Sequence, residues 1–171
     1  ERKKIQQEIK NSEIRYRTLF ENAYDAIFIM QNERFIDCNQ ATLDIFKFNR
    51  KEEILNKKPW EFSPEFQPDG KKSADQAQRL ISEALEGNPQ SFHWQHLRSD
   101  NSILEADVSL NLIIFENKKY LQAIVRDVTE RVQAENKLKQ SEQRYQILSD
   151  ATFEAIFLSD KGVCTGQNKT A

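Results

Sequence analysis

The chain has 171 residues, of which 30% are charged and 38% hydrophobic, and its formal net charge is −2. This length suits one ordinary domain with additional helices, and the charge balance gives no general attraction for nucleic acid or anionic lipid. Only four glycines are present and no apolar run approaches the roughly 20 residues that span a membrane, which excludes a glycine-rich phosphate loop and a membrane span.

Residues 1–21 are expected to form an amphipathic linker helix. Ile5, Ile9, Tyr16 and Leu19, with Ser12 between them, are spaced by 4, 3, 4 and 3 positions. This is the spacing of a coiled-coil seam. So narrow an apolar stripe needs a partner, and we expect a second copy of the chain to supply it. The alternative is a helix that folds back on its own domain.

Residues 26–46 predict a β-hairpin followed by a short helix. The runs AIFIM (26–30) and RFIDC (34–38) flank a polar turn, as in a hairpin. Asn39 comes next and can N-cap a helix over 40–46. Three prolines between 49 and 68 then allow only short helical turns.

A longer helix is predicted from Ser73 to Glu86. Ser73 and Gln76 match the S-x-x-Q capping box, and Gly87 followed by Pro89 is typical of a helix end. The helix has one apolar face, formed by Ala77, Leu80, Ile81, Ala84 and Leu85.

Three strands are predicted next, over 91–97, 103–115 and 119–128. The middle one alternates clearly, with Ala106, Val108, Leu110, Leu112 and Ile114 on one face. The order of elements predicts an α+β fold with a five-stranded antiparallel sheet. One face of this sheet packs on the small helices and the longer helix, and can enclose a pocket.

The end of the chain repeats its beginning. A shift of 129 positions aligns the two, with twelve identities over the 42 comparable positions and no gap. The second copy of the seam includes Leu138 and Tyr145. A repeat this long is a whole domain with its linker.

We therefore expect a linker helix at 1–21, a complete domain at 22–128, a second linker helix at 129–149 and the truncated start of another domain at 150–171. The chain starts without Met, and we therefore expect it to be a piece of a longer protein.

Four stretches resemble the Per-ARNT-Sim (PAS) sensory domain with its PAC-type C-terminal half. They are SEIRYRTLFENAYDAIFIM at the entry, CNQATLDIF after the second strand, FHWQHLRSDNSILEADVSL in the later strands, and VRDVTERVQAENKLKQSEQRY at the exit. The last contains the D-[IV]-T-E-R signature that leads into a signalling helix. The resemblance extends over the whole chain, and the order of the four stretches, together with the repeat, makes the match specific. Glu1 and Arg2 resemble the end of the same signature, which implies a further domain before this chain.

The resemblance implies a non-enzymatic signalling module from a cytoplasmic, multi-domain protein such as a sensor histidine kinase or a cyclase. Asp127, Thr129, Glu130 and Arg131 match the exit signature and are the predicted signal-transmission residues, with Thr129 able to cap the exit helix. The expected partners are a second copy through the linker helices, and the adjacent PAS and output domains. The first expectation is a sensor that detects an unknown small molecule or partner and transmits the signal through the coiled-coil linker helices to a C-terminal output domain. The alternative is a ligand-free dimerisation and relay module.

The candidate pocket residues come from the predicted core, its aromatic side chains and the cations nearest to it. They are Phe28, Asn39, Phe46, Trp60, Ile81, Leu85, Trp94 and Arg126. Asn39 is more simply explained as a cap, and Arg126, like Arg98, as a solvated strand residue. Glu105 and Asp107 are expected on a solvated sheet face, so they do not indicate glycoside chemistry.

No residue pattern points to a particular cofactor or metal. His93 and His96 lie three apart on one strand and face apart, so they cannot share an ion. The resemblance implies a histidine in the longer helix for haem and an Asn-Cys-Arg motif for cysteinyl flavin, and neither is present. We expect no covalent cofactor. Cys38 and Cys164 have no metal-ligand spacing, and Cys38 is expected to be a packing residue.

Overall fold

The computed structural model describes residues 2–150, 157–160 and 163–167. The chain forms two compact units, Glu1–Thr129 and Glu130–Ala171. The first holds the sheet and the second most of the exit helix.

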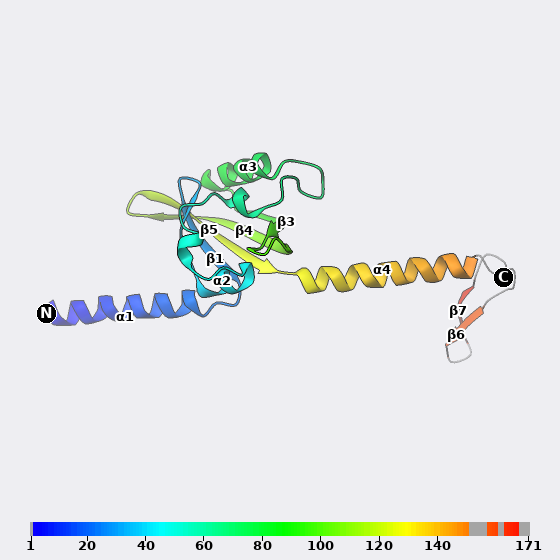
Figure 1. The fold of residues 1–171 in the computed structure, drawn as a ribbon. Coiled ribbons are helices and arrows are strands. Elements are labelled where there is room, and N and C mark those ends of the chain that lie inside the picture. The colour runs from blue at the N-terminus through cyan, green and yellow to red at the C-terminus, as the bar shows by residue number, and fades with distance from the viewer. Residues whose placement is uncertain (1, 151–156, 161–162, 168–171) are drawn as a thin grey trace. The chain divides into compact units, whose positions relative to one another are not determined.

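The first unit contains a five-stranded antiparallel sheet, and this confirms the predicted α+β fold (Figure 1). The strand order is β2-β1-β5-β4-β3, so the first hairpin lies beside the last strand. The strands are β1 (Ala26–Gln31), β2 (Arg34–Cys38), β3 (Gln90–Leu97), β4 (Ile103–Phe115) and β5 (Lys118–Asp127).

In the first unit, the β1–β2 and β4–β5 hairpins each have a two-residue turn in which both residues have a positive φ. These are Asn32 (50°) and Glu33 (60°) between β1 and β2, and Glu116 (48°) and Asn117 (58°) between β4 and β5. Such turns follow the right-handed twist of paired strands, and Asn tolerates this conformation better than most residues do.

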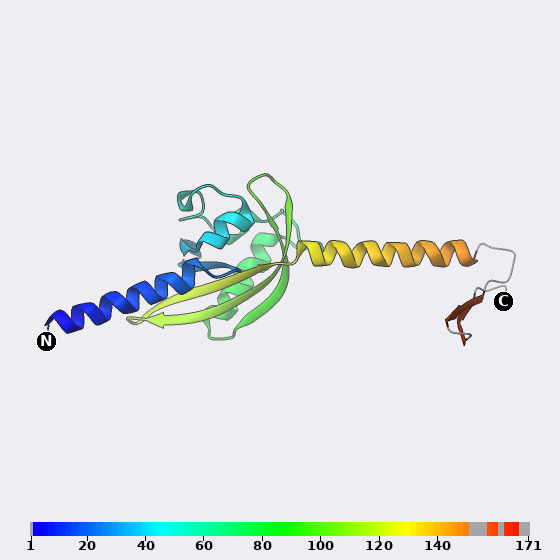
Figure 2. The same ribbon diagram turned by 90° about the horizontal axis from the view of Figure 1, so that it is seen from below.

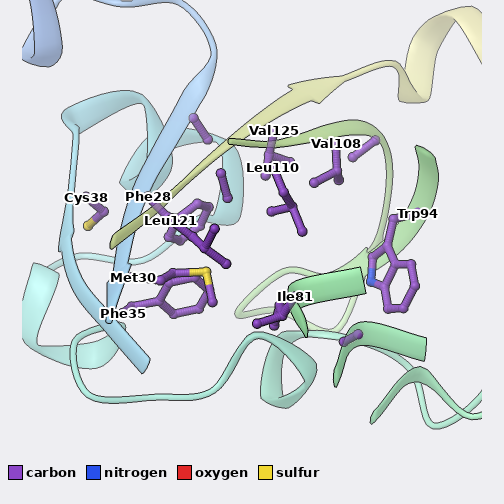
Figure 3. Packing of buried hydrophobic residues seen from close by; sticks show 14 of the residues in the cluster. Phe28, Met30, Phe35, Cys38, Ile81, Trp94, Val108, Leu110, Leu121 and Val125 are labelled. Carbon is purple, nitrogen blue, oxygen red and sulfur yellow. The ribbon is translucent and has the colours of Figure 1, made fainter. Parts of the chain in front are cut away.

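Four helical segments connect β2 to β3 and help to form the core. They are α2 (Gln40–Phe46), η1 (Lys51–Glu53), η2 (Pro59–Phe62) and α3 (Ser73–Leu85). Buried side chains from β1 to β5, α2 and α3 form one hydrophobic cluster. Figure 3 shows side chains of β1, β2, α3 and β3 converging on it.

The predicted alternation of β4 is confirmed over most of the strand, where Ala106, Val108 and Leu110 are buried. The unbroken pairing with β5 keeps Ile114 on the predicted face, but its side chain is 66% exposed. The β4–β5 hairpin continues past the core cluster and past α3, so its far end has little to pack against (Figure 2).

The start of α3 differs from the predicted capping box. Ser73 is buried and its hydroxyl donates to Pro64 O at 2.5 Å, while Gln67 Nε2 donates to the same hydroxyl at 2.8 Å. Gln76 Nε2 donates to Asp69 instead of returning to the helix start. The side chains of Ser73 and Gln76 therefore hold the loop before α3, and neither caps the helix.

Helix α1 (Arg2–Glu21) confirms the first predicted helix, and its last turn contacts the domain. Phe20 is buried, and the ammonium of Lys51 lies 5.8 Å from the centre of its ring. Glu21 pairs with Lys51 at 2.9 Å and accepts a hydrogen bond from Gln40 N at 2.8 Å. These contacts fix the end of α1 against η1 and the start of α2.

The second unit contains most of α4 (Thr129–Asp150) and a hairpin of β6 (Phe157–Asp160) and β7 (Val163–Gln167). The register of this hairpin is that of β1 and β2 shifted by 129 positions. Phe28 pairs with Cys38 and Phe157 with Gln167, and a bulge follows Ile29 in one hairpin and Leu158 in the other. By the same repeat, the strand of the second domain is expected over 154–159, and its residues 154–156, like Asn168, which repeats Asn39, lie outside the described residues.

Candidate functional site

A cavity of about 50 Å³ lies inside the core of the first unit. All five strands contribute to its wall, and α2, η2 and α3 supply the rest. The lining residues include no Asp, Glu, Lys or Arg. Almost the whole wall is therefore hydrocarbon or aromatic, which suits an apolar occupant.

Seven of the seventeen residues that line the cavity have aromatic rings. The centre of the Phe28 ring lies 4.4 Å from that of Phe35 and 5.4 Å from that of Phe46. Phe62, from η2, lies 6.0 Å from Phe35. The three pairs are tilted, edge-to-face and stacked, in that order, and their separations are those of packed aromatic rings, so the open volume beside the cluster is small.

Two polar side chains in the wall bond to each other. The indole Nε1–H of Trp94 donates to Ser63 Oγ at 3.0 Å. The hydroxyl of Ser63 in turn is placed to donate to Pro59 O, at 3.5 Å. This hydrogen bond ties β3 to η2 and occupies the polar atoms of both side chains.

The third polar side chain of the wall is His96, and it is only half satisfied. Its Nδ1 lies 3.3 Å from Phe62 O, which can only accept, so Nδ1 carries the proton. Burial lowers the pKa of His96 to about 4, so the ring is neutral near pH 7. Nε2 is then an acceptor. Among the described residues, it is the one buried side-chain nitrogen or oxygen atom that has no hydrogen-bond partner. Leaving such an atom unpaired costs about 1–3 kcal/mol.

His93 faces away from His96, as predicted from their spacing. It is on the outer face of the sheet, where Nε2 lies 2.8 Å from Glu105 and Nδ1 lies 3.1 Å from Asp107. Partial burial opposes protonation, but the hydrogen bonds to the two carboxylates and their charges outweigh it and raise the pKa of His93. No group of three His, Cys, Asp or Glu among the described residues is arranged as a metal site.

Four of the eight predicted pocket residues line the cavity: Phe28, Phe46, Ile81 and Trp94. Asn39 does not, because its side chain caps α2 as predicted. Its Oδ1 accepts from Thr42 N at 3.1 Å and from Ile27 N at 2.9 Å, and its Nδ2 donates to Asp25 O. Asn39 is fully buried and joins β1 to α2.

The other three predicted pocket residues also lie outside the wall. Trp60 packs beside the core with the ammonium of Lys58 4.8 Å from the centre of its ring. Leu85 packs at the edge of the core cluster. Arg126 is exposed and pairs with Asp25 at 2.9 Å, so its charge is directed to the surface.

The joint between β5 and α4 is built on Asp127. Its Oδ2 accepts from Arg98 Nη2 at 2.6 Å, and its Oδ1 accepts from Thr129 N at 2.9 Å. Arg98 also donates to Ile45 O at the end of α2. Arg98, predicted as a solvated strand residue, is therefore largely enclosed and links three elements.

Thr129 has a different contact from the predicted helix cap. Its hydroxyl accepts from Glu105 N at 3.1 Å, so the side chain holds β4 while Asp127 satisfies the first amide of α4. Glu130 lies in the first turn of α4, where a negative charge is favourable, and Arg131 lies 4.0 Å from Glu135.

The predicted seam residues are exposed on both linker helices. They are Ile5, Ile9, Tyr16, Leu138 and Tyr145, each at least half exposed. The ring of Tyr16 stacks on Phe20 at 5.7 Å. The two helices thus carry apolar side chains at heptad spacing that nothing in their own unit covers.

Cys38 packs in the core cluster, and its side chain is fully buried. Burial raises the pKa of its thiol to about 11, so the thiol stays protonated and unreactive near neutral pH.

Sequence reasoning missed Phe35, Phe62, Ser63 and the pocket position of His96. Phe62 and Ser63 belong to the irregular segment between α2 and α3, whose path no periodicity predicts. His96 could have been found, because it shares a strand face with Trp94 at period two.

Comparison with known proteins identifies this fold. The model of the PAS domain family matches residues 25–130. A curated relative, the methyl sulfide methyltransferase-associated sensor of Methanosarcina acetivorans, is 30% identical over 129 residues, 74% of this chain and 12% of its own. Sporulation kinase A of Bacillus subtilis is 23% identical over 142 residues, 82% of this chain and 23% of its own. The chain thus spans less than a quarter of either relative.

A solved structure agrees in fold. The PAS domain of an HTR-like protein from Haloarcula marismortui has a TM-score of 0.63 with 23% identity, and the match covers 73% of this chain and 98% of that domain. Among the described residues, no helix has the length and apolar character needed to cross a bilayer.

Proposed function

We propose a sensory function, starting from the fact that the chain belongs to the PAS domain family. In this proposal a small molecule enters the core cavity and shifts the balance between two conformations of the domain. The exit helix α4 then transmits the shift to an output domain, for which a histidine kinase is the first candidate. The two curated relatives, one named a sensor and the other a kinase, support a signalling role.

The observation that carries the proposal is the position of the cavity relative to the exit joint. His96 lines the cavity, and Arg98 lies two residues further along the chain, directly after β3 ends at Leu97. Arg98 holds Asp127, which in turn holds the first amide of α4. A ligand that moves β3 therefore moves the start of α4 through two contacts, the pair of Arg98 with Asp127 and the hydrogen bond from Thr129 N to Asp127.

The proposal extends to the form of the whole module. The exposed seams of α1 and α4 support a homodimer through the linker helices, beside PAS and output domains of the same protein in the cytoplasm. The module itself senses and performs no catalysis. Its ligand is held without a covalent bond, and haem and cysteinyl flavin stay disfavoured because their expected residues are missing from the sequence. Cys38 is not part of the cavity wall.

A ligand-free dimerisation and relay module is the second candidate. The small volume of the cavity favours it, because 50 Å³ is about a third of the cavity that holds benzene in an engineered protein. In this candidate the domain sets the spacing and register of the two linker helices, and the signal comes from a neighbouring domain.

Native mass spectrometry of the purified chain, with an absorbance scan of the same sample, tests the two candidates. A dimer with a small additional mass supports the sensor, and the mass begins to identify the ligand. A bare dimer favours the relay module. A visible absorption band contradicts the expectation of no haem or flavin, and a bare monomer contradicts the dimer.

A further inference from the structure

The unpaired Nε2 of His96 defines what the cavity can recognise. His96 is nine-tenths buried and lines the cavity, and Phe62 O occupies its other ring nitrogen. A neutral imidazole with the proton on Nδ1 can only accept at Nε2. An occupant that presents an O–H or N–H group would complete the hydrogen bonds of this ring, whereas an occupant with acceptors alone would not.

The remainder of the wall restricts the occupant further. Ser63 and Trp94 use their polar atoms on each other and on Pro59, so they offer no second strong polar contact. No formal charge lines the cavity, and a charged molecule would lose its hydration without compensation. The occupant is therefore neutral and apolar apart from one donor.

Volume limits the size, and the chemistry of the wall disfavours water. A cavity of 50 Å³ has room for roughly three to five water-sized spheres. A buried water makes about three hydrogen bonds, and this wall offers it one free acceptor. A small ring or short chain with a single donor fits both conditions.

We propose that the cavity binds a small neutral molecule whose single O–H or N–H group donates a hydrogen bond to Nε2 of His96. This inference rests on the proposed sensory function and gives that function a class of ligand. It also assigns His96 as the residue that distinguishes donors from molecules of the same shape without a donor. A site built around one hydrogen bond rejects such analogues because the buried acceptor then stays unpaired.

Pyrrole and furan are matched probes for this site. Both are neutral five-membered rings, and only pyrrole has an N–H donor. The whole chain, labelled with ¹⁵N, is titrated with each probe while amide signals report affinity and long-range ¹H–¹⁵N signals report the imidazole nitrogens. The chain has two histidines, so the variant His93→Leu assigns the signals of His96. His93→Leu is also the matched control, because His93 lies on the same strand outside the cavity.

The expected result is that pyrrole binds about tenfold tighter than furan and shifts the Nε2 signal of His96. The preference persists in His93→Leu and is lost in His96→Leu. If His96→Leu does not fold, the wild-type preference and the Nε2 shift decide alone.

Two results overturn the inference in different ways. Equal binding of pyrrole and furan, or an unchanged Nε2 signal, refutes the role of His96 and leaves a ligand-binding cavity in place. Binding of neither probe refutes the inference alone, and the mass spectrum of the purified chain then decides between the ligand sensor and the relay module.

Discussion

Asp127 and Arg98 form the contact that connects the sheet to the exit helix, with Nη2 of Arg98 2.6 Å from Oδ2 of Asp127. The second oxygen of Asp127 accepts from the first amide of α4. One carboxylate thus binds the guanidinium of Arg98, just after β3, and the first amide of α4, so its loss should affect both stability and the order of α4.

We expect Asp127→Asn to lower the free energy of unfolding by about 1–3 kcal/mol, because Arg98 loses its charged partner while its guanidinium stays largely enclosed. Hydrogen exchange at the first turn of α4 should become faster. Urea unfolding and exchange mass spectrometry measure the two effects. Glu116→Gln, on the exposed β4–β5 turn, is the control for loss of one carboxylate, and an equal effect of both variants would contradict this role.

Asn39 is expected to be the most sensitive amide side chain of the domain. Asn39→Ala leaves Ile27 N and Thr42 N without their partner in a buried site, at a cost of about 2–3 kcal/mol. Thermal and urea unfolding give the change. Asn22→Ala, at an exposed position with one hydrogen bond to Thr18 O, should cost well under 1 kcal/mol. Similar losses in the two variants would refute the structural role of Asn39.

His96 should make the domain less stable in acid. Because burial lowers its pKa to about 4, the unfolded chain takes up a proton near pH 6.5 that the folded chain does not. Stability from this residue is therefore full above pH 6.5 and declines as the pH falls towards 4, by about 3 kcal/mol in total. Urea unfolding at pH 7 and pH 4.5 should show a smaller acid loss in His96→Leu than in the wild type. An equal loss would mean that His96 is protonated in the folded state.

The seam of α1 can be tested with two isoleucines that are equally exposed, at 53% each. Ile5 lies in the heptad seam and Ile14 lies outside it. Since a carboxylate is unfavourable in an apolar seam, Ile5→Asp should weaken dimerisation at least tenfold, whereas Ile14→Asp should leave it within about threefold. Sedimentation velocity over a concentration series measures both. Equal effects would point to an interface elsewhere on the chain.

The regular elements were predictable because their signals are local. Strict alternation identified β4, and an Asn directly after a strand identified the cap of α2. The failures involve contacts distant in sequence. Ser73 has the residue type of a cap, but Pro64 O and Gln67 are its partners, and Arg98 is enclosed only because α2 and β5 meet there. Only four of the seventeen wall residues of the cavity were predicted, and Phe62 and Ser63 were missed because only the folded chain brings the η2 segment to the sheet.

The pairing of β1 on its two sides has a consequence for the order of folding. Its partner β2 follows after two turn residues, whereas its partner β5 is distant, with Ala26 opposite Val125. Closing so long a loop is slow, whereas a hairpin forms within microseconds. The β1–β2 hairpin and the β3–β4–β5 meander should therefore appear first and then search for each other. Formation of the β1–β5 ladder is then the rate-limiting step, and substitutions there should slow folding more than equally destabilising ones in either hairpin.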